Sequence, residues 1–236
     1  MLIPLVDPVT SDLRVVTRAM YERTEGLWRS LGADYPFREN GFALLYSPPQ
    51  HAPELLIVGT NPGGGAGAFD LATESRPPMQ HEYLTQSYPL ARAMRTHFEK
   101  IGRVASLRDS VKINVLFFRT PSMSLWDEQV PRELRERLER FCLNEVHGLV
   151  RNLDPRRVLA ETSYAFWRVC EGQAEEIRTT NGRLVARLGR FDGRPLLGIG
   201  HPSRSRLSSE EREELRGMLR SFVDGEMDRE QPAQQS

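Results

Sequence analysis

Short apolar runs alternate along the chain with longer segments in which apolar residues recur every three or four positions. Runs of four to eight apolar residues favour buried strands, whereas the longer periodicity favours amphipathic helices. The predicted strands of a central sheet are Glu54–Thr60, Lys112–Phe118, Arg157–Ala160 and Pro195–Gly200. These runs are almost continuously apolar, which is typical of parallel strands covered on both faces. A further segment, Arg183–Leu188, lies between Asn-Gly and Asp-Gly turn signals and predicts an edge strand.

Helices are predicted between these strands, and each has a local signal for its start or end. The expected helices begin within Thr10-Ser11-Asp12, at Pro131 and at Ser208, one ends at Gly102, and a short one lies within residues 162–172. Ser, Thr and Asp are favoured N-caps, Pro is favoured at helix starts and Gly at helix ends. Ser208 and Glu211 have the spacing of a capping box.

The order of strands and helices indicates an α/β fold. We expect a three-layer α/β/α sandwich with a central, mainly parallel four-stranded sheet. The 236 residues, 39% of them hydrophobic, suffice for a single core. We therefore expect one domain over residues 1–224, followed by a polar, disordered tail over residues 225–236.

The charge balance limits the classes of partner. The 32 basic and 32 acidic residues give a net charge of zero, which argues against a protein that coats nucleic acid. DNA binding through a local basic patch remains compatible with this balance. No apolar run approaches the roughly 20 residues that a membrane span needs, and the first residues do not resemble a secretory signal. We expect a cytoplasmic monomer without membrane contact.

Two cysteines, Cys142 and Cys170, lie in apolar, helix-like stretches and are expected to be buried thiols. Two cysteines cannot supply the four thiolates of an iron–sulfur cluster. No Cys and His spacing indicates zinc. We therefore expect no cofactor, no metal and no iron–sulfur cluster.

The residues that follow the predicted strands are the first place to look for a site. In open parallel sheets, ligands bind beyond the carboxyl ends of the strands. Asn61 follows the first predicted strand, residues 118–121 follow the second and His201 follows the fourth. Residues 61–88 form a long polar segment, and a loop of that length in a compact domain is usually functional.

Three motifs at these strand ends resemble the uracil-DNA glycosylase superfamily. The first is Gly59-Thr60-Asn61-Pro62-Gly63, the second is the strand that carries Asn114, and the third is His201-Pro202-Ser203. The first is similar to the Gly-x-Asn-Pro-Gly motif of the mismatch-specific and single-strand-selective branches. The third is similar to the superfamily's His-Pro-Ser motif. The resemblance covers roughly residues 50 to 210, and the cysteine count excludes the iron–sulfur branches.

The resemblance implies a DNA glycosylase, a monofunctional hydrolase that flips a base out of DNA and cleaves its bond to the sugar. Asn61 is then a catalytic residue that orients the attacking water, because an amide has no useful pKa for a general base. His201 is the second catalytic residue and donates a hydrogen bond to the departing base. Asn114 reads the Watson–Crick edge of the flipped pyrimidine.

The resemblance also implies contacts around these residues. Phe69 stacks on the base, with Phe42 and Phe118 as competing aromatic residues, and Gly59 and Gly63 belong to the motif that contacts it. The implied DNA-binding residues are Ser203, Arg204, Arg206, Leu207 and Arg119. Arg204 and Arg206 contact phosphates or the opposite base, Arg119 adds a phosphate contact, and Leu207 is the wedge that fills the gap left by the base.

One departure from the related branches concerns the substrate. A branch with Asp in the first motif places a Tyr after the Pro, where it blocks a pyrimidine 5-substituent; this chain has Asn61 and Gly63 instead. An open side there admits uracil, thymine or a bulkier 5-modified pyrimidine. Uracil indicates repair, and a bulky modified base indicates antiviral defence against phage with modified DNA.

Two other classes of function stay open. Residues 63–68 can be aligned with a dinucleotide-binding G-x-G-x-x-A, although neither the helix nor the acidic residue of that motif follows clearly. A nucleotide-binding hydrolase is therefore one alternative. A catalytically inactive DNA- or protein-binding module on the same fold is the other, and the neutral net charge favours it.

Overall fold

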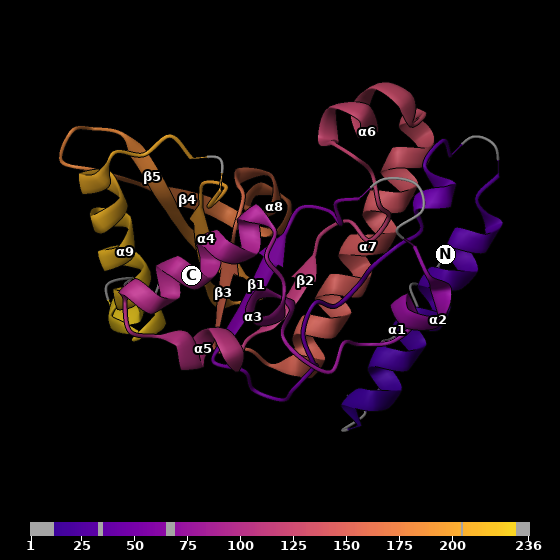
Figure 1. Ribbon diagram of the computed structural model, residues 1–236, viewed down its shortest axis with the longest axis horizontal. Coiled ribbons are helices and arrows are strands. Elements are labelled where there is room, and N and C mark those ends of the chain that lie inside the picture. The colour runs from indigo at the N-terminus through magenta and orange to yellow at the C-terminus, as the bar shows by residue number, and fades with distance from the viewer. Residues whose placement is uncertain (1–11, 33–34, 65–68, 204, 230–236) are drawn as a thin grey trace.

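A computed structural model of the 236-residue chain describes residues 12–32, 35–64, 69–203 and 205–229. Its centre is a six-stranded sheet of order β2-β1-β3-β6-β5-β4 (Figure 1). The strands are β1 Leu55–Gly59, β2 Val111–Asn114, β3 Arg157–Ala160, β4 Glu171–Arg178, β5 Leu184–Phe191 and β6 Arg194–Ile199. The first four in the sheet order are mutually parallel, while β5 and β4 add antiparallel.

The four apolar runs form the parallel part of the sheet, as predicted, but the sheet has six strands and not four. The strand β4 escaped prediction because its sequence, Glu171–Arg178, is polar and largely exposed at the sheet edge. The segment predicted as an edge strand, β5, lies inside the sheet between β6 and β4. The strand β2 ends at Asn114 and not at Phe118, because the chain then turns to pair with Phe42.

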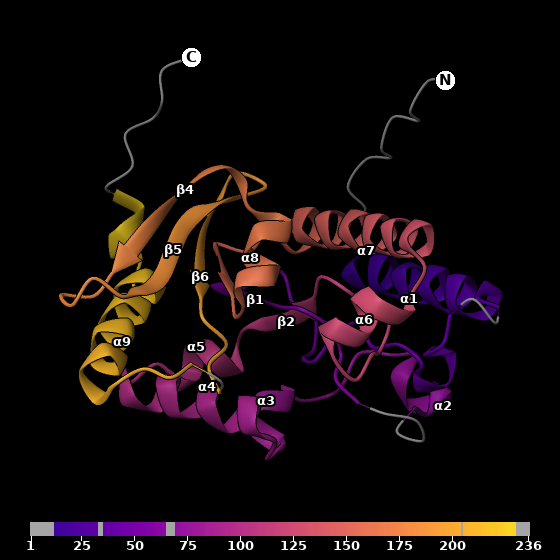
Figure 2. The same ribbon diagram turned by 90° about the horizontal axis from the view of Figure 1, so that it is seen from above.

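Helices cover both faces of the sheet, which confirms the three-layer arrangement (Figure 2). One face carries α1 Leu13–Ser30, α6 Met123–Gln129, α7 Arg132–Leu153 and α8 Ser163–Val169. The opposite face carries α3 Glu82–Thr85, α4 Pro89–Lys100, α5 Val104–Arg108 and α9 Ser209–Val223. Alternate residues of β1 serve the two cores: Leu56 and Val58 face α1 and α7, and Leu55 and Ile57 face α4 and α9.

The helix signals in the sequence correspond to the observed ends. Asp12 caps α1 through its side chain, and Gly102 follows α4 with a φ of 69°. The Ser208 hydroxyl accepts from the Glu211 backbone at 3.1 Å, while the Glu211 carboxylate accepts from the Ser208 backbone at 2.7 Å. This reciprocal pair is the predicted capping box of α9.

Three parts of the chain differ from the sequence expectations. The segment 61–88 is not a plain loop, because it holds the one-turn helices α2 Leu71–Glu74 and α3. Glu226–Arg229 forms a 3-10 turn within the expected tail, and residues 230–236 lie outside the described residues. Cys142 is buried as expected, while Cys170 is only half-buried. Within the described part of the chain, no helix has the length and apolar character that a membrane crossing requires.

Candidate functional site

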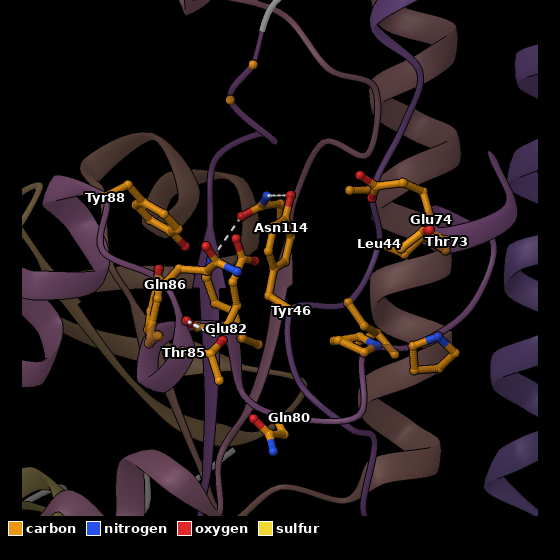
Figure 3. Close-up of a pocket in the computed structure, with 18 of the residues that line it drawn as sticks. Leu44, Tyr46, Thr73, Glu74, Gln80, Glu82, Thr85, Gln86, Tyr88 and Asn114 are labelled. Carbon is orange, nitrogen blue, oxygen red and sulfur yellow. Dashed lines mark hydrogen bonds between the residues drawn. The ribbon is translucent and has the colours of Figure 1, made fainter. Parts of the chain in front are cut away.

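A cavity of about 970 Å³ lies beyond the carboxyl ends of β1 and β2. Residues of the segment 61–88 form more than half of its lining, including the helices α2 and α3. Residues 43–46 provide another wall, and β2 together with the residue after β3 provides the base of the cavity (Figure 3). The cavity is therefore at the position where a parallel sheet binds its ligand.

A buried ion pair lies at the base of the cavity. Lys112 Nζ is 2.7 Å from Glu161 Oε1, and the two side chains are only 3% and 2% exposed. The Lys112 ammonium also donates to Asn114 Oδ1 at 2.9 Å and to the Ile113 carbonyl at 3.4 Å. All three of its N–H donors thus have an acceptor. A buried ion pair is tolerated when its remaining donors and acceptors are hydrogen-bonded in this way.

Two tyrosines complete the buried network, a name we use for Lys112, Asn114, Glu161, Tyr46 and Tyr83. The Tyr83 hydroxyl donates to Glu161 Oε2 at 2.5 Å, and Asn114 Nδ2 donates to the Tyr46 hydroxyl at 3.0 Å. The ammonium of Lys112 lies 5.3 Å from the Tyr46 ring centre and 5.7 Å from that of Tyr83. Burial raises the pKa of both tyrosines, and the Glu161 charge raises the pKa of Tyr83 further. Both phenols therefore stay protonated.

Gly59 is required by this network. It is paired with Asn114 across the β1–β2 register. A Cβ at position 59 would lie 2.2 Å from Asn114 Oδ1, 2.3 Å from Lys112 Nζ and 2.5 Å from Glu161 Oε1. Gly59 was expected at the base-binding motif, but its environment is the ion pair, and it is not part of the cavity lining.

Asn61 and Asn114 line the same cavity, whereas the prediction also placed His201 with them. Asn61 Nδ2 donates to the carbonyls of Pro62 and Thr120, each at 3.2 Å. Because both partners are acceptors, only the amide nitrogen can face them, so Oδ1 is directed to the other side. Gly63 also lines the cavity.

Arg119 differs from its predicted role as a phosphate contact. Its guanidinium donates to the Gly63 carbonyl at 2.8 Å and to Glu74 Oε1 at 2.6 Å. The side chain is 14% exposed and lines the cavity. Arg119 therefore fastens the first motif to α2 and does not present its charge on the surface.

His201 does not line the cavity. It follows β6, and β3 separates β6 from β1 in the sheet. Its Nδ1 lies 3.2 Å from the Ser203 hydroxyl, and its carbonyl accepts from the Ser205 backbone at 3.0 Å. The structure thus brings Asn61 and Asn114 together without the third motif residue.

The rest of the third motif divides into exposed and buried side chains. Ser203 and Arg206 are exposed, while Arg204 lies outside the described residues. Leu207, the predicted wedge, is 9% exposed and packs in the core with α9. Its side chain contributes to the packing of that helix, so it is not displayed for insertion into DNA in this conformation.

Phe69 packs away from the cavity. Its ring centre lies 5.2 Å from that of Trp28 and 5.4 Å from that of Phe42, in tilted arrangements. It also covers Gly41, where a Cβ would lie 2.1 Å from the ring. The predicted stacking on a base is replaced by an aromatic cluster, in which Phe69 packs against Trp28 of α1 and against Phe42.

Lys112 and Glu161 were missed in the sequence, although each carried a signal. Lys112 is a charge at the start of an apolar run, two positions before Asn114 and thus on the same face of the strand. Glu161 directly follows β3, the one parallel strand whose end was not considered. A charge beside an apolar buried strand needs a partner, and these two partner each other.

Three carboxylates and three cations line the cavity: Glu74, Glu82, Glu161, Arg76, Lys112 and Arg119. Burial raises the pKa of Glu82, while the charges of Lys112 and Arg119 oppose this and Glu74 adds to it. Burial likewise raises the pKa of Glu74 against the pull of Arg119. The mutual influence of these groups indicates that α2, α3 and the base of the cavity converge on one space.

His81 has a structural role beside the cavity. Its Nδ1 accepts from the Tyr83 backbone at 3.2 Å and so caps α3, while Nε2 lies 3.0 Å from the Ser110 hydroxyl. Burial, assisted by the Lys112 charge, lowers the pKa of His81 to about 4. The neutral ring therefore holds in place the helix that carries Glu82 and Tyr83.

Among the described residues, one group has metal-ligand chemistry: His147, Glu171 and Asp192, whose ligand atoms lie within 4.8 Å of one another. It is separate from the cavity lining. Glu171 already accepts from the Gly193 backbone at 3.4 Å, and Asp192 lies 3.5 Å from Arg194. These partners compete with an ion for the carboxylates.

The comparisons with known proteins add no relative: the chain matches no protein-family model, and no curated protein matches it.

The buried network predicts strong coupling between Lys112 and Glu161. We expect Lys112→Met to lower the free energy of unfolding by about 3–5 kcal/mol, because it leaves the Glu161 charge buried without its cation. Lys112→Met combined with Glu161→Gln should recover at least half of that loss. Denaturant titration of both variants measures the difference, with the exposed Lys100→Met as control. Equal losses in the single and double variants would show that the pair is not coupled.

The lowered pKa of His81 predicts a pH dependence of stability. The unfolded chain binds a proton as pH falls through about 6.5, whereas folded His81 binds it only near 4. The free energy of unfolding should therefore fall with decreasing pH across that window, by about 1.4 kcal/mol per unit for this group. His81→Asn keeps a capping acceptor and should flatten the slope by that amount in urea titrations between pH 6.5 and 4. An unchanged slope contradicts this assignment.

Proposed function

We propose that the protein is a DNA glycosylase that hydrolyses the N-glycosidic bond of a flipped pyrimidine and leaves an abasic site. One observation carries the proposal. Asn61 and Asn114, from the ends of two neighbouring parallel strands, line one cavity, and protein partners fix the orientation of both amides. An amide of fixed orientation is suited to direct a water or to read the edge of a base.

Asn61 supplies the part of the chemistry that needs an oriented water. Its amide nitrogen is held by two backbone carbonyls, so its oxygen is the group available to accept from a nucleophilic water. The bond between the base and C1′ of the sugar breaks, so that the base leaves as an anion and the sugar carries positive charge. A water on the open face of the sugar then bonds to C1′, and its proton passes to the departed base anion. An amide cannot remove the proton in advance, so Asn61 acts by position.

Asn114 supplies base recognition. Lys112 can only donate, so it fixes Oδ1 of Asn114 toward itself, while Nδ2 faces Tyr46. One N–H and one lone pair of the amide remain, and their order cannot reverse. Pyrimidines with a 4-oxo group and those with a 4-amino group present opposite donor and acceptor orders. The fixed amide therefore discriminates between these two classes.

The size of the cavity favours a 5-substituted base. Its volume of about 970 Å³ is at the upper end of cavities that hold drug-sized ligands, which are much larger than a bare pyrimidine. Gly63 and Gly64 line it, and by the resemblance Gly63 takes the place of the Tyr that closes the 5-position in a related branch. A cavity of this size has room for the base that uracil repair removes and for the base that defence against phage with modified DNA removes. The identity of the excised base would distinguish the two roles.

His201 has a conditional place in this proposal. It stands outside the cavity in this structure, so a hydrogen bond to the departing base requires that residues 201–207 move when DNA binds. His201→Ala tests this role separately from Asn61. A loss of activity in both variants supports the movement. A loss in Asn61→Ala alone means that groups other than His201 stabilise the departing base.

The proposal predicts that the protein produces abasic sites at one of three classes of base: uracil, mismatched thymine or 5-substituted pyrimidines. Asn61→Ala should lower the single-turnover rate by about 10²–10³-fold, because an oriented group at the reacting centre is lost. The assay incubates single- and double-stranded oligonucleotides with protein and reveals abasic sites with alkali. Asn152→Ala, which removes an amide bonded to its own helix α7, is the matched control.

The same assay separates the alternative class. A catalytically inactive binding module would leave every substrate intact, and Asn61→Ala would have no effect on DNA retention. Abasic sites that persist unchanged in Asn61→Ala would place the chemistry elsewhere in the molecule.

A further inference from the structure

We infer that the cavity accommodates a pyrimidine whose 5-substituent is a neutral, hydroxyl-rich group of sugar size, and that Glu82 is a specificity-determining residue for it. This inference rests on the proposed function and names its substrate class. It follows from the room in the cavity, from the chemistry of its wall and from the arrangement of its charges.

Asn61 and Asn114 account for only part of the cavity. They and the buried network meet at its base, where a flipped pyrimidine would lie. The volume of about 970 Å³ leaves space beyond a ring of that size, toward the wall formed by α2 and α3. A bare uracil would leave that space filled with water.

The wall around the remaining space carries two kinds of polar side chain. Hydroxyls and amides both donate and accept hydrogen bonds, and carboxylates are strong acceptors. These hydroxyl, amide and carboxylate groups belong to Thr73, Glu74, Gln80, Glu82, Thr85 and Gln86. All six are drawn around the cavity (Figure 3). Once Asn114 has bound its edge, a pyrimidine ring keeps only its 2-oxo group for hydrogen bonding, which leaves most of these side chains without a partner. Vicinal hydroxyls, each a donor and an acceptor, match this set.

Glu82 is the central member of the wall. It begins α3, is half-buried, and bonds through its side chain to Tyr88, whose ring also lines the cavity. Of the three cations that line the cavity, Lys112 is paired with Glu161 and Arg119 with Glu74, while Arg76 is exposed and forms no salt bridge with Glu82. Glu82 is therefore a carboxylate without a salt-bridge partner among the described residues, and it can accept from ligand hydroxyls. Tyr88 offers an aromatic face beside it.

The charges of the wall also argue against an anionic substituent. Glu74 and Glu82 stand on opposite sides of the space, on α2 and α3. A phosphate or carboxylate placed between them would meet repulsion from both, because Lys112 and Arg119 are already neutralised and the third cation of the lining, Arg76, is exposed to solvent, where its charge is screened. A neutral polyol avoids this cost and gains hydrogen bonds to charged acceptors, which are stronger than those between neutral groups.

The inference is tested first by binding, in the Asn61→Ala background so that turnover does not consume the ligand. The probes are oligonucleotides of one sequence that carry 5-hydroxymethyluracil or 5-hydroxymethylcytosine, each with and without a glucose on the hydroxymethyl group. We expect at least one glucosylated base to bind about tenfold tighter than its unglucosylated form. Glu82→Ala should remove that preference and leave binding of the unglucosylated base within about twofold. Glu99→Ala, an exposed carboxylate on α4, should change neither.

Excision by the wild-type protein on the same oligonucleotides, and on uracil, then separates the two claims. A preference for the glucosylated base in binding without any excision supports the inference and overturns the glycosylase. Excision of uracil or of unglucosylated bases, with no gain from glucose, supports the glycosylase and overturns the inference. A glucose preference that survives Glu82→Ala overturns the role of that residue.

Discussion

The buried ion pair between Lys112 and Glu161 is the interaction on which the site depends. The two charges lie 2.7 Å apart with almost no exposure, so each must keep every hydrogen-bond partner it has. That requirement fixes the amide of Asn114 and the hydroxyl of Tyr83. It also excludes any side chain at Gly59, because a Cβ there would collide with Lys112, Glu161 and Asn114. A protein in which such an ion pair is replaced by apolar residues is often as stable as the original. The orientation of Asn114 therefore explains the presence of the Lys112–Glu161 pair better than stability does.

The strand order explains how the pair acquires this influence. The strands β2, β1 and β3 are adjacent and parallel, so Asn114, Gly59 and Glu161 meet at the carboxyl ends of these strands. Asn61, two residues after β1, lies beside them, and Arg119 holds this motif through the Gly63 carbonyl. The walls of the cavity come from α2 and α3, whose placement depends on contacts with the same strands, including Tyr83 on Glu161.

The sequence was sufficient for the parts of the fold and site that local patterns determine. Apolar runs located the parallel strands, and the end of the first strand located Asn61, since both features need only the chain direction. Asn114 was singled out as a polar residue within an apolar run and by likeness to other proteins, in a strand that was expected to continue to Phe118. The polar edge strand β4 was invisible because it buries little on either face. Phe69, Leu207 and Arg119 were placed by likeness to other proteins, but their positions here follow from tertiary partners: Trp28, the core around α9, and Glu74. Lys112 and Glu161 escaped because their pairing is recognisable only once β2 and β3 are placed on either side of β1.

The most direct test of the account is a crystal structure of the Asn61→Ala protein with an oligonucleotide that carries the preferred base. The account predicts that the base is rotated out of the stack into the cavity. Its Watson–Crick edge should lie within hydrogen-bond distance of the Asn114 amide, with the Lys112–Glu161 pair unchanged beneath it. DNA bound on another face, or a base that remains stacked while the cavity holds only water, would contradict it.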